Sequence, residues 1–244
     1  MQIAGKLASL RRYPVKSMAG EDLAQARVTF AGLAGDRVYA FVDNRNLSDF
    51  PWMTARQGRD MILFRPRFLH ATEIEQDIPD APSYAMEIVS PEGETFRLPG
   101  DDLRPFLEKR YGRDLRLRFS ERSMTDARPI SIFGLATIRA LSEETGLALD
   151  PRRFRANFYV EWQDDRPFLE DSHVGRELQM GETVTLQIVK KDQRCIMITL
   201  DPETAVSAPV VLEKVSREHA GCAGVYAVVL REGVVRAGDP VYLL

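Results

Sequence analysis

Short apolar runs separated by turn residues fill most of this chain of 244 residues, and they limit its possible folds more than any other feature. Runs of about four to eight residues bounded by Gly, Pro, Asn, Asp or Ser are typical of strands. We therefore expect a chain dominated by β-structure. The predicted strands are Gln2–Tyr13, Ala26–Phe30, Val38–Asp43, Met61–Phe68, Tyr84–Ser90, Thr95–Leu98, Leu115–Phe119, Phe158–Trp162, Thr183–Val189, Ile196–Leu200, Val225–Leu230 and Val241–Leu243.

Few segments have apolar residues at the spacing of a helix. Asp101 or Asp102 is expected to cap a helix that ends at Tyr111, and Leu135–Thr145 and Val210–His219 are the other candidates. The "SPEGET" segment, Ser90–Thr95, has the Pro and Gly of a hairpin turn. The predicted fold class is mostly β (α+β): a barrel or sandwich with a few helices.

Two polar segments interrupt the apolar pattern. Thr72–Ser83 contains proline and is predicted to be a surface loop, and Arg118–Pro129 is the best candidate for a joint. The joint predicts two β-rich domains, residues 1–120 and 121–244, each within the usual size range of a domain. Two such domains can still share one interface and one site.

Composition and charge exclude several classes of protein. The net charge of −3, from 36 acidic and 33 basic residues, gives no general attraction to nucleic acid or anionic lipid. No apolar run approaches the roughly 18 to 20 residues that a bilayer span needs, and the N-terminus does not resemble a signal peptide. The chain has only two cysteines, which give no disulfide framework, and its three histidines lack metal-ligand spacing. We expect a cytoplasmic protein without nucleic-acid or membrane partners.

One cysteine has an unusual position. Cys195 follows Arg194 inside "DQRCIMITLDP", and Lys190 and Lys191 precede it. These cations would favour the thiolate, which is the form that acts as nucleophile and metal ligand. The alternative is a buried cysteine that packs as a small hydrophobic residue.

Basic residues also stand where strands begin or end. Lys16 and Ser17 follow Pro14 in "YPVKSMAGE", and Arg37 lies between a glycine turn and an apolar strand. A lysine here is either a phosphate ligand or a solvated loop residue, and Arg37 either pairs with Asp36 or faces a ligand.

Two further segments carry arginines. "MTARQ" contributes Arg56, and "RRFRAN" contributes Arg153, Arg155 and Asn157 at the start of a predicted strand. Alternate residues of a strand share a face, so these last three residues could point the same way. In a net-acidic protein, such arginines are candidate ligands of an anion.

The segments "YPVKS", "GLAGDR", "TARQ", "RFRAN", "EDSHVGRELQMGE" and "QRCIMITLDPET" occur in the order in which they occur in the MOSC family. From about residue 8 to Leu244 the chain resembles this family, and in particular the mitochondrial amidoxime-reducing component and its bacterial counterparts. The resemblance implies a β-rich N-terminal MOSC domain and a MOSC β-barrel, with the molybdenum cofactor (Mo-molybdopterin) held between them.

The resemblance also implies roles for individual residues. Cys195 matches the cysteine that supplies a thiolate ligand to molybdenum, which suits a metal already bound by sulfur. Ser131 and Thr137 lie in "RPISIFGLATIRAL", a segment that departs from the relatives' pattern. Pyridoxal phosphate is not expected. The residues that match positions binding the pterin and its phosphate are Lys16, Ser17, Arg37, Arg56, Arg155 and Asn157, with Ser131 and Thr137 as further candidates.

The implied activity is the reduction of N-hydroxylated compounds such as amidoximes, hydroxylamines and N-hydroxylated bases. Relatives with their own electron supply carry a C-terminal ferredoxin domain with clustered cysteines, and this sequence shows none up to Leu244. An external electron donor is therefore expected, either a ferredoxin or a flavoprotein and cytochrome pair. The alternatives are a carrier of the cofactor or of sulfur, and a barrel that binds no cofactor.

Three acidic residues and the second cysteine complete the candidates. Asp201 is expected to make an Asx-type turn after the cysteine segment, and Glu170 and Asp171 could lie near the mouth of the site. Cys222 has no role in the resemblance, and we expect it to be a buried structural thiol.

Overall fold

The computed structural model of the chain describes residues 2–71 and 84–244. Its main element is a β-barrel: β11 pairs with β10 on one side and with β1 on the other, which closes a ring of seven strands within this described part. Leu10 of β1 lies opposite Phe158 of β11 in the closing pair. Along the ring, the strands are β11 (Phe158–Trp162), β10 (Ile130–Gly134), β14 (Cys222–Arg231), β13 (Val184–Gln193), β12 (Glu177–Met180), β16 (Pro240–Leu243) and β1 (Gln2–Arg12), and β2 (Glu21–Leu23) extends β1.

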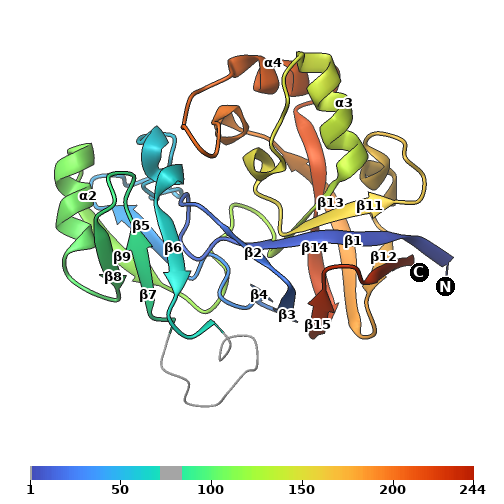
Figure 1. The fold of residues 1–244 in the computed structure, drawn as a ribbon, viewed down its shortest axis with the longest axis horizontal. Coiled ribbons are helices and arrows are strands. Elements are labelled where there is room, and N and C mark those ends of the chain that lie inside the picture. Colours follow the sequence, from blue (N-terminus) through green and yellow to red (C-terminus); the bar gives the residue numbers. More distant parts are fainter. Residues whose placement is uncertain (1, 72–83) are drawn as a thin grey trace.

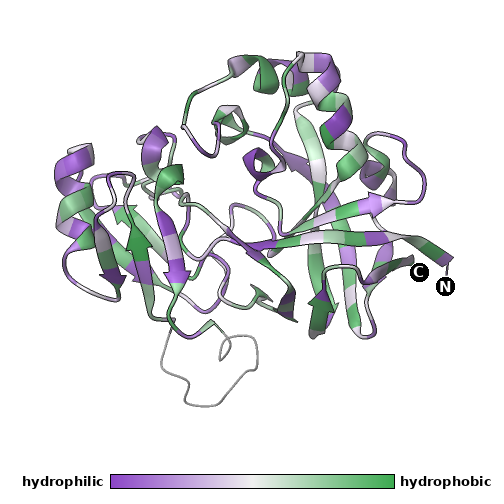
Figure 2. Ribbon diagram, in the orientation of Figure 1, coloured by the Kyte–Doolittle hydropathy of each residue, from purple (hydrophilic) through white to green (hydrophobic). Residues whose placement is uncertain are grey.

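Apolar side chains at alternate positions of the strands fill the interior of the barrel. In β13, the fully buried residues Val184, Leu186 and Ile188 are separated by half-buried ones, so one face of the strand points into the core. The same green and pale alternation follows the barrel strands in Figure 2. The interior is therefore a packed apolar core, and a ligand site must lie outside it.

The N-terminal part forms a second β-rich unit beside the barrel (Figure 1). Strands β5 and β9 pair with each other, and β6, β7 and β8 form a three-stranded sheet, with α2 packed near β9 and β8. A separate apolar cluster makes its core. The bounds are β5 (Tyr39–Asp43), η1 (Arg59–Leu63), β6 (Arg65–Phe68), β7 (Met86–Val89), β8 (Thr95–Leu98), α2 (Leu103–Tyr111) and β9 (Leu115–Phe119).

Strand pairing joins the two parts, in addition to the segment that links them along the chain. β3 (Gln25–Thr29) pairs with β4 (Gly32–Leu33) and also with β15 (Gly233–Arg236) near the end of the chain. β1, although N-terminal, belongs to the barrel. The division at residues 120 and 121 stays a prediction, but N-terminal strands supply part of the C-terminal β-structure.

Helices cover one end of the barrel. α3 (Leu135–Thr145) packs against α4 (Pro209–Glu218), and α3 ends where Gly146 takes the left-handed conformation of a C-terminal cap. Three short 3₁₀ helices lie in the same part of the molecule. They are η2 (Pro151–Phe154), η3 (Leu169–His173) and η4 (Ile196–Thr199).

The mostly β fold class is confirmed, and β8, β9, β11 and α3 have the predicted bounds. The hairpin is also confirmed, because the Ser90 amide donates to Glu94 O at 2.8 Å between β7 and β8. The Thr72–Ser83 loop prediction lies outside the described residues. No helix that the structure describes has the length and apolarity that crossing a bilayer requires.

Two strand predictions were wrong. Ile196–Leu200 is largely the 3₁₀ helix η4, closed by a bond from Thr199 Oγ1 to Ile196 O, because a short apolar run does not distinguish a strand from a buried turn. The first half of Met61–Phe68 is η1, which begins after Gly58. The fully buried strand Ile130–Gly134 was not predicted.

Candidate functional site

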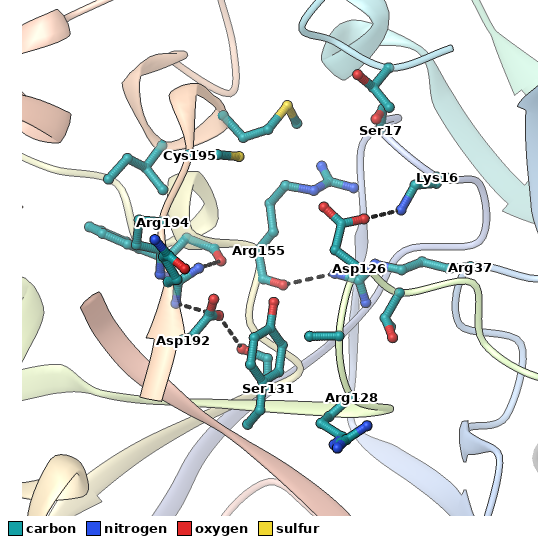
Figure 3. Close-up of a pocket in the computed structure, with 18 of the residues that line it drawn as sticks. Lys16, Ser17, Arg37, Asp126, Arg128, Ser131, Arg155, Asp192, Arg194 and Cys195 are labelled. Atoms are coloured by element: carbon teal, nitrogen blue, oxygen red, sulfur yellow. Dashed lines mark hydrogen bonds and ion pairs between the residues drawn. The ribbon is translucent and has the colours of Figure 1, made fainter. Parts of the chain in front are cut away.

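A cavity of about 460 Å³ lies where the N-terminal unit meets the barrel. Its wall combines the loops after β1 and β5, the segment before β10, the end of η2 and the end of β13. Figure 3 shows Lys16 and Cys195 on opposite sides, with Arg155 between them. Of the predicted site residues, those that line the cavity are Lys16, Ser17, Arg37, Arg56, Ser131, Arg155, Asn157 and Cys195.

Lys16 and Ser17 lie in a tight turn after β1. The Lys16 amide donates to Tyr39 O at 2.8 Å, and Ser17 has a positive φ of 67°. The Lys16 side chain is buried, and its Nζ donates to Met124 O at 3.0 Å and to the Asp126 carboxylate. Burial lowers the pKa of Lys16, and the attraction of Asp126 opposes that shift. Lys16 is therefore a buried side chain fixed by its hydrogen bonds, and not a solvated loop residue.

Arg37 pairs with Asp36, which is one of the two alternatives for its sequence position, and it also lines the cavity. Its Nη1 pairs with Asp36 Oδ2 at 2.5 Å, and its Nη2 donates to Arg155 O at 3.0 Å while the side chain still lines the cavity. Two guanidinium groups lie over the Tyr13 ring, that of Arg37 at 4.8 Å and that of Arg155 at 4.3 Å from the ring centre. Tyr13 thus positions two cations at one wall by cation–π contact.

Arg155 is the least compensated charge of the site. It follows η2 with a positive φ of 53°, and no carboxylate in the described residues forms an ion pair with it. Its buried Nη2 has no hydrogen-bond partner there. Burial lowers the pKa of Arg155 to about 10, so the side chain is still charged at neutral pH. A buried, charged donor without a partner is costly unless a ligand anion compensates it.

The "RRFRAN" segment is not the beginning of a strand, because Pro151–Phe154 forms η2 and β11 begins only at Phe158. Arg153, Arg155 and Asn157 nevertheless all line the cavity. The turn, and not strand alternation, brings them together.

Asn157 and Ser131 line the cavity and are connected by hydrogen bonds. Asn157 Oδ1 accepts from the Ser131 amide at 3.1 Å, and Ser131 Oγ donates to Asp192 Oδ2 at 3.2 Å. Asp192 also pairs with Arg194 Nη2 at 2.9 Å. Burial raises the pKa of the Asp192 carboxyl, and Arg194 opposes that rise. The result is a network that fixes the end of β13 directly before Cys195.

Cys195 joins β13 to η4 in an extended conformation, and it is a free, half-buried thiol on the cavity wall. The basic neighbours expected to surround it have other partners. Arg194 donates to Ala223 O at 2.6 Å and to Phe154 O at 2.7 Å, and Lys191 pairs with Asp171 at 2.8 Å. Arg194 therefore positions the backbone at Cys195, and the thiol is placed at the cavity and not in the core.

Of the residues predicted to bind the cofactor, Thr137 is the one that does not line the cavity. It is fully buried, and its Oγ1 donates to Glu170 Oε1 at 2.9 Å. Glu170 also accepts from the Gly134 amide at 3.0 Å, so it holds the start of α3 and does not lie at the mouth of the site. Asp201 makes the expected turn, since its Oδ1 accepts from the amides of Glu203 and Thr204. Cys222 is half-buried and also lies outside the cavity wall.

Sequence reasoning missed Asp126, Asp192, Tyr13 and Tyr226. Asp126 reaches Lys16 and lies 3.9 Å from Arg56, and burial alone would raise its pKa, but Lys16 lowers it overall. Nothing in the spacing of the polar segment around Asp126 indicated this contact. Tyr13, however, lies in the "YPVKSMAGE" segment close to Lys16, and an aromatic residue near basic residues indicates a possible cation–π contact.

The cavity wall carries an excess of positive charge although the chain is net acidic. Of the residues that the structure describes, Asp126 and Asp192 are the only carboxylates in this wall. Such a wall favours an anionic ligand with phosphate-like groups. The lining cations are Lys16, Arg37, Arg56, Arg128, Arg153, Arg155, Lys190 and Arg194.

The fold and this cavity define a class: a β-barrel protein with a second β-rich unit, whose shared cavity is cationic and carries one free thiol. The MOSC domain model matches residues 120–242, and the model of the MOSC N-terminal beta barrel domain matches residues 4–102. The chain belongs to the MOSC family.

Two curated relatives are each 25% identical to the chain. The match to Molybdenum cofactor sulfurase of Drosophila grimshawi runs over 250 residues and covers 90% of the chain but only 31% of the relative. The match to human Mitochondrial amidoxime-reducing component 1 covers 100% of the chain and 84% of the relative. The crystal structure of the YUAD protein from Bacillus subtilis shares the fold, with a TM-score of 0.53 at 15% identity, over 98% of this chain and 95% of that one.

Proposed function

We propose that the protein binds the molybdenum cofactor in the cationic cavity and reduces N-hydroxylated compounds with electrons from a separate donor. The observation that carries the proposal is Arg155, a half-buried cation with a buried Nη2 and no ionic partner among the described residues, in a cavity that the thiol of Cys195 also lines. Amidoximes are the substrate class that the human relative's name suggests.

The residues of the cavity fit such a cofactor. A pterin with a phosphate group and a dithiolene is anionic, and the buried Lys16 and the half-buried Arg37 and Arg155 supply positive charge to the cavity. Cys195 supplies the soft thiolate that molybdenum in a sulfur environment prefers. Bound there, the metal would supply the two-electron redox chemistry that side chains lack.

The protein's own groups would bind, orient and hold protons. The Ser131–Asp192–Arg194 network fixes the backbone before Cys195, so the thiol keeps one position. Reduction of an amidoxime to an amidine consumes two electrons and two protons and releases one water. Asp192 lines the cavity; burial raises the pKa of its carboxyl and the pair with Arg194 opposes that rise, so Asp192 is a candidate for proton transfer there.

The test is made on protein purified from a host that synthesises the cofactor. Molybdenum and pterin are quantified first, and reduction of benzamidoxime with an artificial electron donor is then measured on the same sample. Near-stoichiometric molybdenum with turnover is the expected result. A folded sample without metal or pterin would refute cofactor binding.

A second function uses the same cavity and is favoured by the match to the sulfurase. The protein would then carry the cofactor or a persulfide on Cys195 without turning over substrate. Molybdenum without benzamidoxime reduction, together with transfer of the cofactor to an apo-enzyme, is the result that this function predicts.

A further inference from the structure

A second cavity, of about 150 Å³, adjoins the first and shares Arg153, Arg155 and Met197 with it. It lies between the end of β1, the start of β6, η2 and the turn that follows η4. No role proposed above uses it. Arginine is the commonest residue in its wall, because Arg11, Arg65 and Arg152 line it in addition to the two shared arginines.

The charges that face this cavity are unbalanced. Three of its arginines pair with carboxylates that do not line it: Arg11 with Asp22 at 2.5 Å, Arg152 with Asp150 at 2.6 Å and Arg153 with Asp201 at 2.9 Å. Within the described part of the chain, Glu203 is the only carboxylate in the wall, and it pairs with Arg65 and Arg152 at 3.2 Å and 2.5 Å. Among the described residues, the wall thus holds five guanidinium groups and one carboxylate, and Arg155 is the arginine of the wall that has no carboxylate partner there.

Three of these arginines also keep donors unused. Arg11 and Arg153 are 8% and 9% exposed, and the Nε atom of each is buried without a hydrogen-bond partner in the described residues. Arg155 Nη2 is also buried and has no hydrogen-bond partner in the described residues. Buried donors are nearly always satisfied, so these three guanidinium nitrogens need a partner that the described residues do not supply, and a bound anion is one that matches their charge.

We propose that the second cavity binds a small doubly charged oxyanion of the size of sulfate or hydrogen phosphate. Its volume suits such an ion and is too small for a nucleotide. Guanidinium groups match the oxygens of a tetrahedral oxyanion, and the ion would compensate Arg155 from the side away from Lys16. Anions in the two cavities would then compete for the charge of Arg155 and weaken each other's binding. The proposal does not rest on the molybdenum cofactor.

The site is located with selenate, which is close to sulfate in charge and shape and scatters anomalously. Crystals of the full chain soaked in selenate are expected to show an anomalous peak in the second cavity, among Arg11, Arg152 and Arg153. A peak in the first cavity alone, or in neither, would overturn the proposal. A soak with ribose 5-phosphate tests the source of the oxyanion: a phosphate ester held there would contradict the assignment to a free inorganic ion.

Affinity for sulfate is then measured by titration at constant ionic strength, because screening alone changes such interactions. Glu203→Gln removes the only carboxylate of the wall, and its side chain is 51% exposed, so folding is expected to be unaffected. We expect it to bind sulfate at least about threefold more tightly. Glu143→Gln, the same change on the exposed surface of α3, is the matched control and should leave the affinity unchanged.

Arg11→Met supplies the opposite change. It keeps the apolar stem and removes the guanidinium, and its partner Asp22 is 72% exposed and tolerates the loss. Sulfate affinity should fall at least about tenfold. If Glu203→Gln and Glu143→Gln bind sulfate equally, the cavity is no oxyanion site, whatever Arg11→Met does to folding.

Discussion

Arg155 carries a charge that the described protein does not neutralise, and Arg37 nearby lowers its pKa further after the main effect of burial. Arg155→Met keeps an apolar stem and removes the guanidinium group that lies over the Tyr13 ring. We expect the free energy of unfolding of the cofactor-free protein to rise by about 1 kcal/mol, since a site built for a ligand anion costs stability. Molybdenum content should fall at least about tenfold. Denaturant unfolding and metal analysis measure the two effects, and Arg128→Met, an exposed arginine of the same wall, should not stabilise.

The two cysteines provide a matched pair at the same scale. Cys195 lines the cavity, whereas Cys222, also half-buried, lies outside its wall. Cys195→Ala should abolish benzamidoxime reduction and change the melting temperature little, because one small side chain is removed and the cationic wall stays intact. Cys222→Ala should keep activity. Full activity of cofactor-loaded Cys195→Ala would disprove the ligand assignment.

At the scale of elements, β14 approaches β10 closely at Gly224. This residue has φ of +76°, and an added Cβ would lie 2.7 Å from Phe133 Cδ2, 2.8 Å from Ile132 O and 3.1 Å from Arg194 Nη2. Gly224→Ala should therefore destabilise the fold by about 1–3 kcal/mol and displace the arginine that positions Cys195. Gly221, with φ of +74° and open space around its Cβ position, is the control. Equal losses in both alanine variants would assign the whole effect to backbone strain.

The elements also show why part of the site was predictable. Strands with clear alternation or turn boundaries, such as Thr95–Leu98 and Phe158–Trp162, follow from local pattern. Ile130–Gly134 did not, because a fully buried strand loses the alternation and this one follows a polar joint. Lys16, Arg37 and Cys195 were found through motif order. Asp126 was not, since its contact with Lys16 joins residues far apart in the chain and leaves no trace in spacing.

For the whole molecule, strand exchange between the halves decides how it folds. β1 closes the barrel through β11 and β16, and β3 pairs with β15, so residues 121–244 alone lack strands that their own β-structure needs. An open barrel leaves unpaired edges and an exposed core. We expect the fragment 121–244 to be unfolded or aggregated, and the full chain to unfold in one transition. Circular dichroism of the fragment and denaturant unfolding of the chain followed by Trp fluorescence, from Trp52 and Trp162 in the two parts, make the comparison. A folded fragment, or two separate transitions, would show that the halves are independent despite the shared strands.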